Sequence, residues 1–89
     1  ELKAALVKIE RAVNLDRTNA AAVFHRGLLQ KRLNNVFPAF RDFARAVQLD
    51  PSHTEAEREV RLFAMRAKKG SGEHKLAVDV LEKLEKSSK

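Results

Sequence analysis

The side chains that could carry out chemistry are few and widely spaced in this 89-residue sequence. Cysteine is absent, which excludes disulfides, thiolate metal sites and cysteine nucleophiles. The three histidines, His25, His53 and His74, are too far apart along the chain to form a local pair of metal ligands. Gly70-Ser71-Gly72 lacks the Gly-Lys-Ser/Thr ending of a phosphate-binding loop. The sequence therefore predicts neither an enzyme nor a bound metal or cofactor.

The chain does carry an excess of positive charge. It has 18 Lys and Arg residues against 12 Asp and Glu, and the net charge of +6 falls within residues 17–70. Such a segment is either a surface for an acidic partner or a solvated helix face. No apolar run approaches the ~20 residues that span a bilayer, and no basic leader opens the sequence. We therefore expect a cytoplasmic protein without a membrane partner.

Helices must position these residues, because apolar side chains recur every three or four positions along the chain. Turn and capping residues divide this pattern into five segments. Ser52 and Glu55 have the spacing of a capping box, and Gly70 suits the C′ position of the helix that they open. The prediction is an all-α single domain, residues 1–89, of antiparallel helices. The expected helices cover residues 2–15, 19–33, 37–49, 53–68 and 73–86.

A repeat of 34 residues underlies these helices. When residues 5–16 are shifted by 34 positions, eight of the twelve residue pairs are identical or both apolar. A helix–turn–helix unit of this length resembles the tetratricopeptide repeat. The resemblance implies a helical solenoid in which residues 1–16 are the second helix of a truncated unit. Residues 20–53 are then a complete unit, and residues 54–86 a degenerate or capping unit.

The packing that this resemblance implies depends on small residues. Gly27, Ala39 and Ala46 would let the two helices of the complete unit approach closely, while Phe43 fills the wedge between them. Asn34 replaces the glycine that is usual in the turn of the unit, which is tolerable because asparagine also adopts the left-handed conformation.

The last unit departs from the family's pattern. Arg61 stands 34 residues after Gly27, so a close approach of its two helices is not expected, and Arg61 can pair with Glu57 or Asp50 instead. The fifth helix also starts about four residues later than the period requires, which adds either one helical turn or a longer loop.

Members of this family bind peptides or partner proteins on a concave surface that the first helix of each unit lines. The resemblance therefore implies an apolar groove with basic ends, formed by helices 19–33 and 53–68. An acidic and hydrophobic peptide or partner helix would complement this groove. The positions that the resemblance places in the groove are Ala21, Phe24, His25, Leu28, Lys31, Arg32, Glu55, Arg58, Leu62, Met65 and Arg66.

Other interpretations of these residues stay open. Phe24 and Leu28 can belong to the helical core, and the basic residues can form a solvated face. In the subset of the family that clamps the C-terminal carboxylate of chaperones, the clamp positions correspond to Phe24, Leu28 and Glu59. A glutamate at such a position would repel that ligand, so a chaperone-tail clamp is not expected.

Three alternative hypotheses concern the whole chain. A basic nucleic-acid-binding module is favoured by the net charge but opposed by the lack of Trp and Tyr. Residues 49–63 are similar to the tetratricopeptide tail of some bacterial J-domain co-chaperone proteins, so the chain could be a spacer or repeat region of such a protein. The stripe Leu2, Leu6 and Ile9 is expected to be exposed and could pair two copies as a homodimer.

Overall fold

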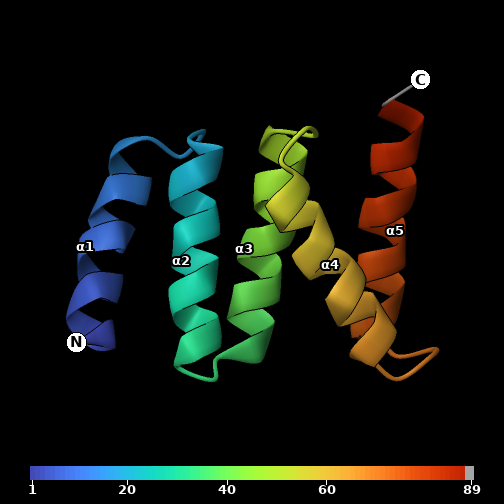
Figure 1. Ribbon diagram of the computed structural model, residues 1–89. Helices are drawn as coiled ribbons and strands as arrows, with labels where there is room; N and C mark the ends of the chain where they lie inside the picture. The colour runs from blue at the N-terminus through green and yellow to red at the C-terminus, as the bar shows by residue number, and fades with distance from the viewer. Residues whose placement is uncertain (88–89) are drawn as a thin grey trace.

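The computed structural model describes residues 1–87, and the five predicted helices are present in it. They are α1 (Leu2–Leu15), α2 (Ala20–Arg32), α3 (Val36–Leu49), α4 (Thr54–Arg66) and α5 (Gly72–Ser87). Consecutive helices run up and down and are joined by short connections (Figure 1). The fold is therefore all-α and built of antiparallel helical hairpins, as the periodicity of the sequence predicted.

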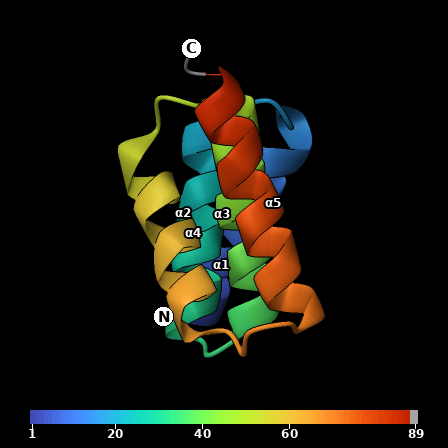
Figure 2. The same ribbon diagram turned by 90° about the vertical axis from the view of Figure 1, so that its right-hand side faces the viewer.

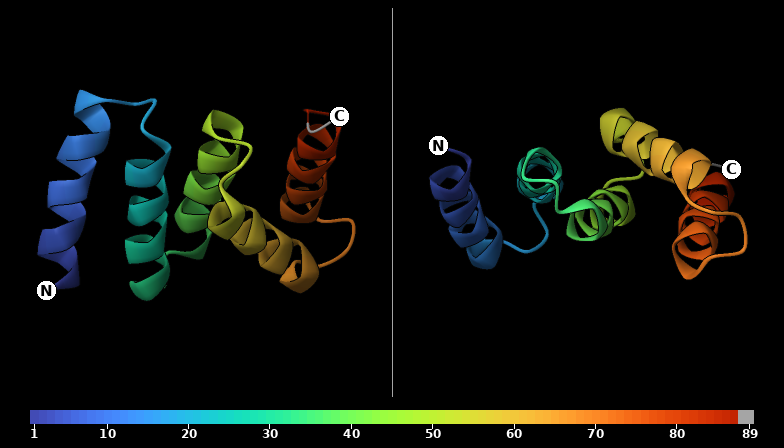
Figure 3. Two further views of the ribbon diagram at one scale, coloured as in Figure 1. Left: turned by 45° about the horizontal axis from the view of Figure 1, so that its top comes forward. Right: turned by 90° about the horizontal axis from the view of Figure 1, so that it is seen from below.

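The helices alternate between two layers. Seen along their axes, α1, α3 and α5 lie on one side and α2 and α4 on the other (Figure 3, right). A side view shows the same separation (Figure 2). α4 is inclined to the other helices, so that it starts near the end of α3 and ends near the start of α5 (Figure 1). One face of the fold therefore belongs to α2 and α4, and the opposite face to α1, α3 and α5.

The turns before α2 and α4 are built by the same hydrogen bonds, 34 residues apart. The Asp16 carboxylate accepts hydrogen bonds from the backbone N–H and the hydroxyl of Thr18, at 3.0 and 2.7 Å. The Asp50 carboxylate accepts the same two bonds from Ser52, at 3.0 and 2.6 Å. In each turn these bonds lower the pKa of the aspartate, with the side-chain bond contributing most. The repeat in the sequence thus continues as a repeat of local structure.

The residue that caps each of these helices follows the turn directly. Asn19 Oδ1 accepts from the backbone N–H of Ala22 at 3.1 Å, and His53 Nδ1 accepts from that of Ala56 at 3.2 Å. The predicted capping box at Ser52 is therefore wrong. Ser52 belongs to the turn, where its hydroxyl donates to Asp50, and α4 begins one residue later than predicted, so that His53 takes the N-cap position.

The loop between α4 and α5 is longer than the equivalent turn between α2 and α3, and this difference accounts for much of the departure from the 34-residue period. α4 ends at Arg66, two residues before the predicted end, because Ala67 is already extended with φ −69° and ψ 144°. Gly70, with φ 85°, lies inside this loop and not at the C′ position. The loop has five residues, 67–71, against three, 33–35, in the turn between α2 and α3. In that shorter turn Asn34 is left-handed with φ 64°, as expected.

The close approach of α2 and α3 is confirmed at Gly27. A Cβ atom at this position would lie 2.8 Å from Phe43 Cε1, closer than real Cβ atoms approach, and a tight 3.1 Å from Asp42 Cβ. Ala39 and Ala46 are buried in the same interface. Arg61, at the position equivalent to Gly27, points into solvent and pairs with Glu57 at 2.7 Å, one of the two partners expected for it.

The apolar stripe of α1 is not exposed as the sequence suggested. Leu2, Leu6 and Ile9 are half-buried, because α1 packs against α2 and contributes the buried side chain of Val13 to the core. The large apolar residues that α1 leaves exposed are Val7 and Leu15. The stripe therefore gives no support to a homodimer.

Candidate functional site

An apolar groove opens on the face that α2 and α4 form, where the second half of α4 diverges from α3. Its volume is about 720 Å³, which is within the range of about 300–1,000 Å³ typical of ligand pockets. We call it the α2–α4 groove. It is lined by Lys31, Asn34, Val36, Ala39, Phe40, Phe43, Glu59, Leu62, Phe63, Arg66, Ala67, Lys68, Ser71 and Glu73.

Aromatic rings form the floor of the groove. Phe40 and Phe63 stack with their ring centroids 4.1 Å apart and an angle of 15° between the rings, and Phe43 lies one helical turn further along α3. Phe40 and Phe43 are buried, so they provide a fixed surface. At the edge of this floor Val36, the first residue of α3, is 54% exposed. An apolar side chain of a ligand would cover Val36 and remove it from water.

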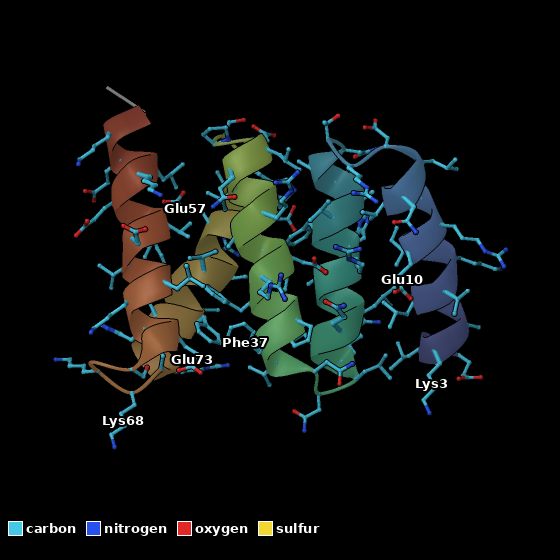
Figure 4. The ribbon with its side chains drawn as sticks, turned by 180° about the vertical axis from the view of Figure 1, so that it is seen from behind. Lys3, Glu10, Phe37, Glu57, Lys68 and Glu73 are labelled. Carbon is cyan, nitrogen blue, oxygen red and sulfur yellow. The ribbon has the colours of Figure 1, made fainter. Side chains whose placement is uncertain are left out.

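The rim of the groove is charged. Lys31 Nζ contacts both carboxylate oxygens of Glu59 at 2.8 Å, and this pair connects α2 to α4. The remaining charges are Arg66 at the end of α4, Lys68 in the loop that follows, and Glu73 at the start of α5. Figure 4 shows Lys68 and Glu73 at the same end of the fold, beside the loop between these two helices. Glu59 neutralises Lys31, whereas at the other end Arg66 and Lys68 outnumber Glu73, so that end of the rim has a net positive charge.

The structure brings three of the predicted groove residues together. Lys31, Leu62 and Arg66 line the groove. Phe24 does not, because it is 5% exposed and packs against Phe43 and His53, with ring centroids 5.5 and 4.7 Å apart. The half-buried Leu28 packs against the core. The other predicted residues are exposed on α2 or α4 outside the groove: Ala21, His25, Arg32, Glu55, Arg58 and Met65.

Sequence reasoning missed the contribution of α3. Val36, Ala39, Phe40 and Phe43 line the groove, whereas the family resemblance assigned it to the first helix of each unit alone. The available signal was Arg61, since a large side chain in place of the small residue at Gly27 indicated that the last unit packs less closely. A looser unit can leave a hollow beside the buried aromatic residues of the preceding helix.

Two other kinds of site were searched for in the described residues. Within residues 1–87, His, Asp and Glu side chains do not gather in groups of three or more that could hold a metal ion. In the same residues, no helix combines the length and the apolar character needed to cross a bilayer.

Comparison with protein-family models, with curated proteins and with solved structures finds no match for this chain. The function of the α2–α4 groove is therefore inferred from its own geometry and charge.

Proposed function

We propose that this chain is a protein-interaction module of the tetratricopeptide type. In this proposal the α2–α4 groove binds a short apolar segment of a partner protein that carries acidic side chains next to its apolar ones. The observation that carries the proposal is the combination of a fixed aromatic floor with an exposed Val36 and a cationic rim at Arg66 and Lys68.

The shape of the groove supports a peptide segment as the occupant. Apolar side chains of a peptide can enter beside Phe40 and Phe63, while its main chain remains at the open surface between α2 and α4. A small molecule is normally buried over about 70–90% of its surface. This groove leaves Lys31, Arg66 and Lys68 exposed to solvent along its edge, which suits a ligand that is only partly enclosed.

The charges support an acidic partner. Arg66 and Lys68 have no carboxylate within ion-pair distance among the described residues, whereas Lys31 is held by Glu59. Exposed charges at the rim of an interface contribute mainly to the rate of association and to the choice of partner. We expect acidic side chains of the partner to lie at the Arg66–Lys68 end of the groove.

A peptide-display selection on the 89-residue chain tests this proposal. The selected peptides should combine large apolar residues with Asp or Glu. Val36→Glu should weaken their binding by about tenfold or more, which corresponds to about 1.4 kcal/mol. Val7→Glu is the matched control, because Val7 is a 50% exposed valine on α1, outside the groove. Backbone amide signals in an NMR titration should move at residues 36, 37, 39–43 and 62–68.

The rim is tested separately with the same peptides. Arg66→Glu should slow association at low salt, and the difference from the unmodified chain should shrink as salt is added. Arg58→Glu, an exposed arginine of the same helix outside the groove, should change the rate less. The proposal is wrong if no peptide is enriched, or if the enriched peptides bind the Val36→Glu and Val7→Glu variants equally well.

A further inference from the structure

A second hollow lies on the opposite side of α3, between α1 and α3. Its volume is about 440 Å³, and four arginines line it: Arg17 in the turn after α1, Arg26 on α2, and Arg41 and Arg45 on α3. We call it the arginine hollow. Asp42 is the single carboxylate residue among the described residues that line it. The hollow is therefore strongly cationic.

The arginine hollow is separate from the α2–α4 groove. Arg41 and Arg45 are four residues apart, so they lie on one face of α3. Phe40 and Phe43 face the groove instead. No residue lines both sites. A change in one site therefore leaves the residues of the other in place, and the two can be tested independently.

Asp42 does not neutralise the hollow, because Arg26 already engages it. Asp42 is 5% exposed, and both of its carboxylate oxygens accept from Arg26, at 2.9 and 2.7 Å. This hydrogen bonding raises the pKa of the Arg26 guanidinium. When the Gln30 amide is turned so that its nitrogen faces Asp42, it donates to the same carboxylate at 2.7 Å. Arg26 and Asp42 thus neutralise each other's charge. The other three arginines of the hollow, Arg17, Arg41 and Arg45, are left to bind a ligand.

Arg17, Arg41 and Arg45 are exposed, and the described residues offer them no carboxylate within ion-pair distance. Two nearby acids lie outside the lining of the hollow. Asp16 accepts its hydrogen bonds from Thr18. Glu10, which lies between α1 and α2 (Figure 4), interacts through its charge with Arg26. The hollow therefore holds like charges whose mutual repulsion a bound anion would relieve.

A phosphate monoester suits this arrangement. It carries about −1.5 to −2 charges at pH 7 on three acceptor oxygens, and guanidinium groups bind such oxygens in pairs. Two carboxylates on one helix would be about 5–6 Å apart at their Cβ atoms and would place less charge at one point. None of the described lining residues is aromatic, so the hollow has no surface on which nucleic-acid bases stack.

We propose that the arginine hollow binds a phosphorylated serine or threonine side chain of a partner protein. Pro38 and Arg45, at its two ends along α3, are seven residues apart, or about 10 Å of helix. That length matches about three residues of extended peptide. The exposed arginines leave the hollow open to solvent, so the main chain of the partner can pass over it while the phosphate contacts Arg17, Arg41 and Arg45.

An NMR titration of the 89-residue chain tests the proposal. The ligand is a short peptide of alanine and glycine around one phosphoserine, with both termini blocked. The same peptide with serine and with glutamate, inorganic phosphate and single-stranded oligothymidine form the other arms. The phosphopeptide should bind most tightly and move the amide signals of residues 13–17 and 39–45. The double variant Arg41→Gln, Arg45→Gln should weaken its binding by about tenfold or more.

Matched variants separate this site from the groove. Arg58→Gln, an exposed arginine outside the hollow, and Val36→Glu in the groove should both bind the phosphopeptide like the unmodified chain. The proposal is overturned if the serine or glutamate peptide binds as tightly as the phosphopeptide. It is also overturned if inorganic phosphate binds as tightly, or if oligothymidine binds more tightly with a steep loss of affinity in salt.

Discussion

Replacing Gly27 with alanine should destabilise the protein, although alanine is the better helix former. The added Cβ atom would lie 2.8 and 3.0 Å from two carbons of the Phe43 ring and 3.1 Å from Asp42 Cβ. Neither neighbour can move away easily. Phe43 is buried against Phe24, and Asp42 is held by two hydrogen bonds from Arg26. The substitution must therefore force α2 and α3 apart or strain the Phe43 side chain.

Two opposing contributions decide how much Gly27→Ala changes the free energy of unfolding. Alanine in a helix interior is favoured over glycine by about 0.5–1 kcal/mol, whereas overpacking a core costs about 1–3 kcal/mol. Because the overlap involves a buried ring, we expect the second contribution to be larger, by about 1–2 kcal/mol. In a domain of this size each kcal/mol lowers Tm by about 4–8 °C. The expected decrease in Tm for Gly27→Ala is thus about 5–15 °C.

Thermal unfolding followed by circular dichroism measures this decrease. Gly72→Ala is the control, because a Cβ atom there meets nothing within 4 Å, and it should leave Tm almost unchanged. Adding Phe43→Leu to Gly27→Ala should cost less than the sum of the two single changes, since a smaller side chain relieves the overlap. A Tm for Gly27→Ala equal to or above that of the unmodified chain would refute the close contact between α2 and α3.

Three further predictions concern the core, the buried ion pair and the turns. Phe24→Ala should lower the free energy of unfolding by about 3–5 kcal/mol in urea titrations, because the ring is buried between Phe43 and His53. A loss below about 1 kcal/mol would show that Phe24 is accessible. Arg26→Met should lower the free energy of unfolding by about 1–3 kcal/mol, since it leaves the Asp42 carboxylate buried without its main hydrogen-bond donor. The third prediction concerns pH. Hydrogen bonds from Ser52 lower the pKa of Asp50 below 3.8 in the folded protein. The stability that these bonds give the fold is therefore fully present above pH 3.8 and is lost as the pH falls through the lowered pKa. Ser52→Ala should therefore flatten the decrease of Tm in acid, and an unchanged acid profile would contradict the role of this turn.

Much of the fold could be predicted from the sequence. The helix positions follow from the apolar period, and the left-handed turn at Asn34 and the close contact at Gly27 follow from residue type and from the 34-residue repeat. The capping residue of α4 could not be chosen correctly, because Ser52 and His53 both carry a side-chain acceptor for the N–H groups of the first turn, and only the folded turn places Ser52 against Asp50 and His53 against Ala56.

The candidate sites were predicted less completely than the helices. Lys31, Leu62 and Arg66 line the α2–α4 groove of the structure, but the α3 residues Phe40 and Phe43, which line it as well, were not among the predicted groove residues. Both had been assigned to packing within the repeat, and a buried ring at the floor of a groove has the same sequence pattern as a ring in a closed core. The pairing of Arg26 with Asp42, 16 residues later in the chain, has no local signal at all.

The sequence by itself determined which residues form helices and where the turns fall. These features depend on interactions between residues a few positions apart, such as the bonds of Thr18 to Asp16 and of Ser52 to Asp50. Only the tertiary structure decided that α4 inclines away from α3 (Figure 1) and that a groove opens above Phe40. It also decided that three arginines of the hollow have no carboxylate within ion-pair distance among residues 1–87. Such features depend on how side chains of different volume pack between helices, and the helical period of the sequence does not specify that packing.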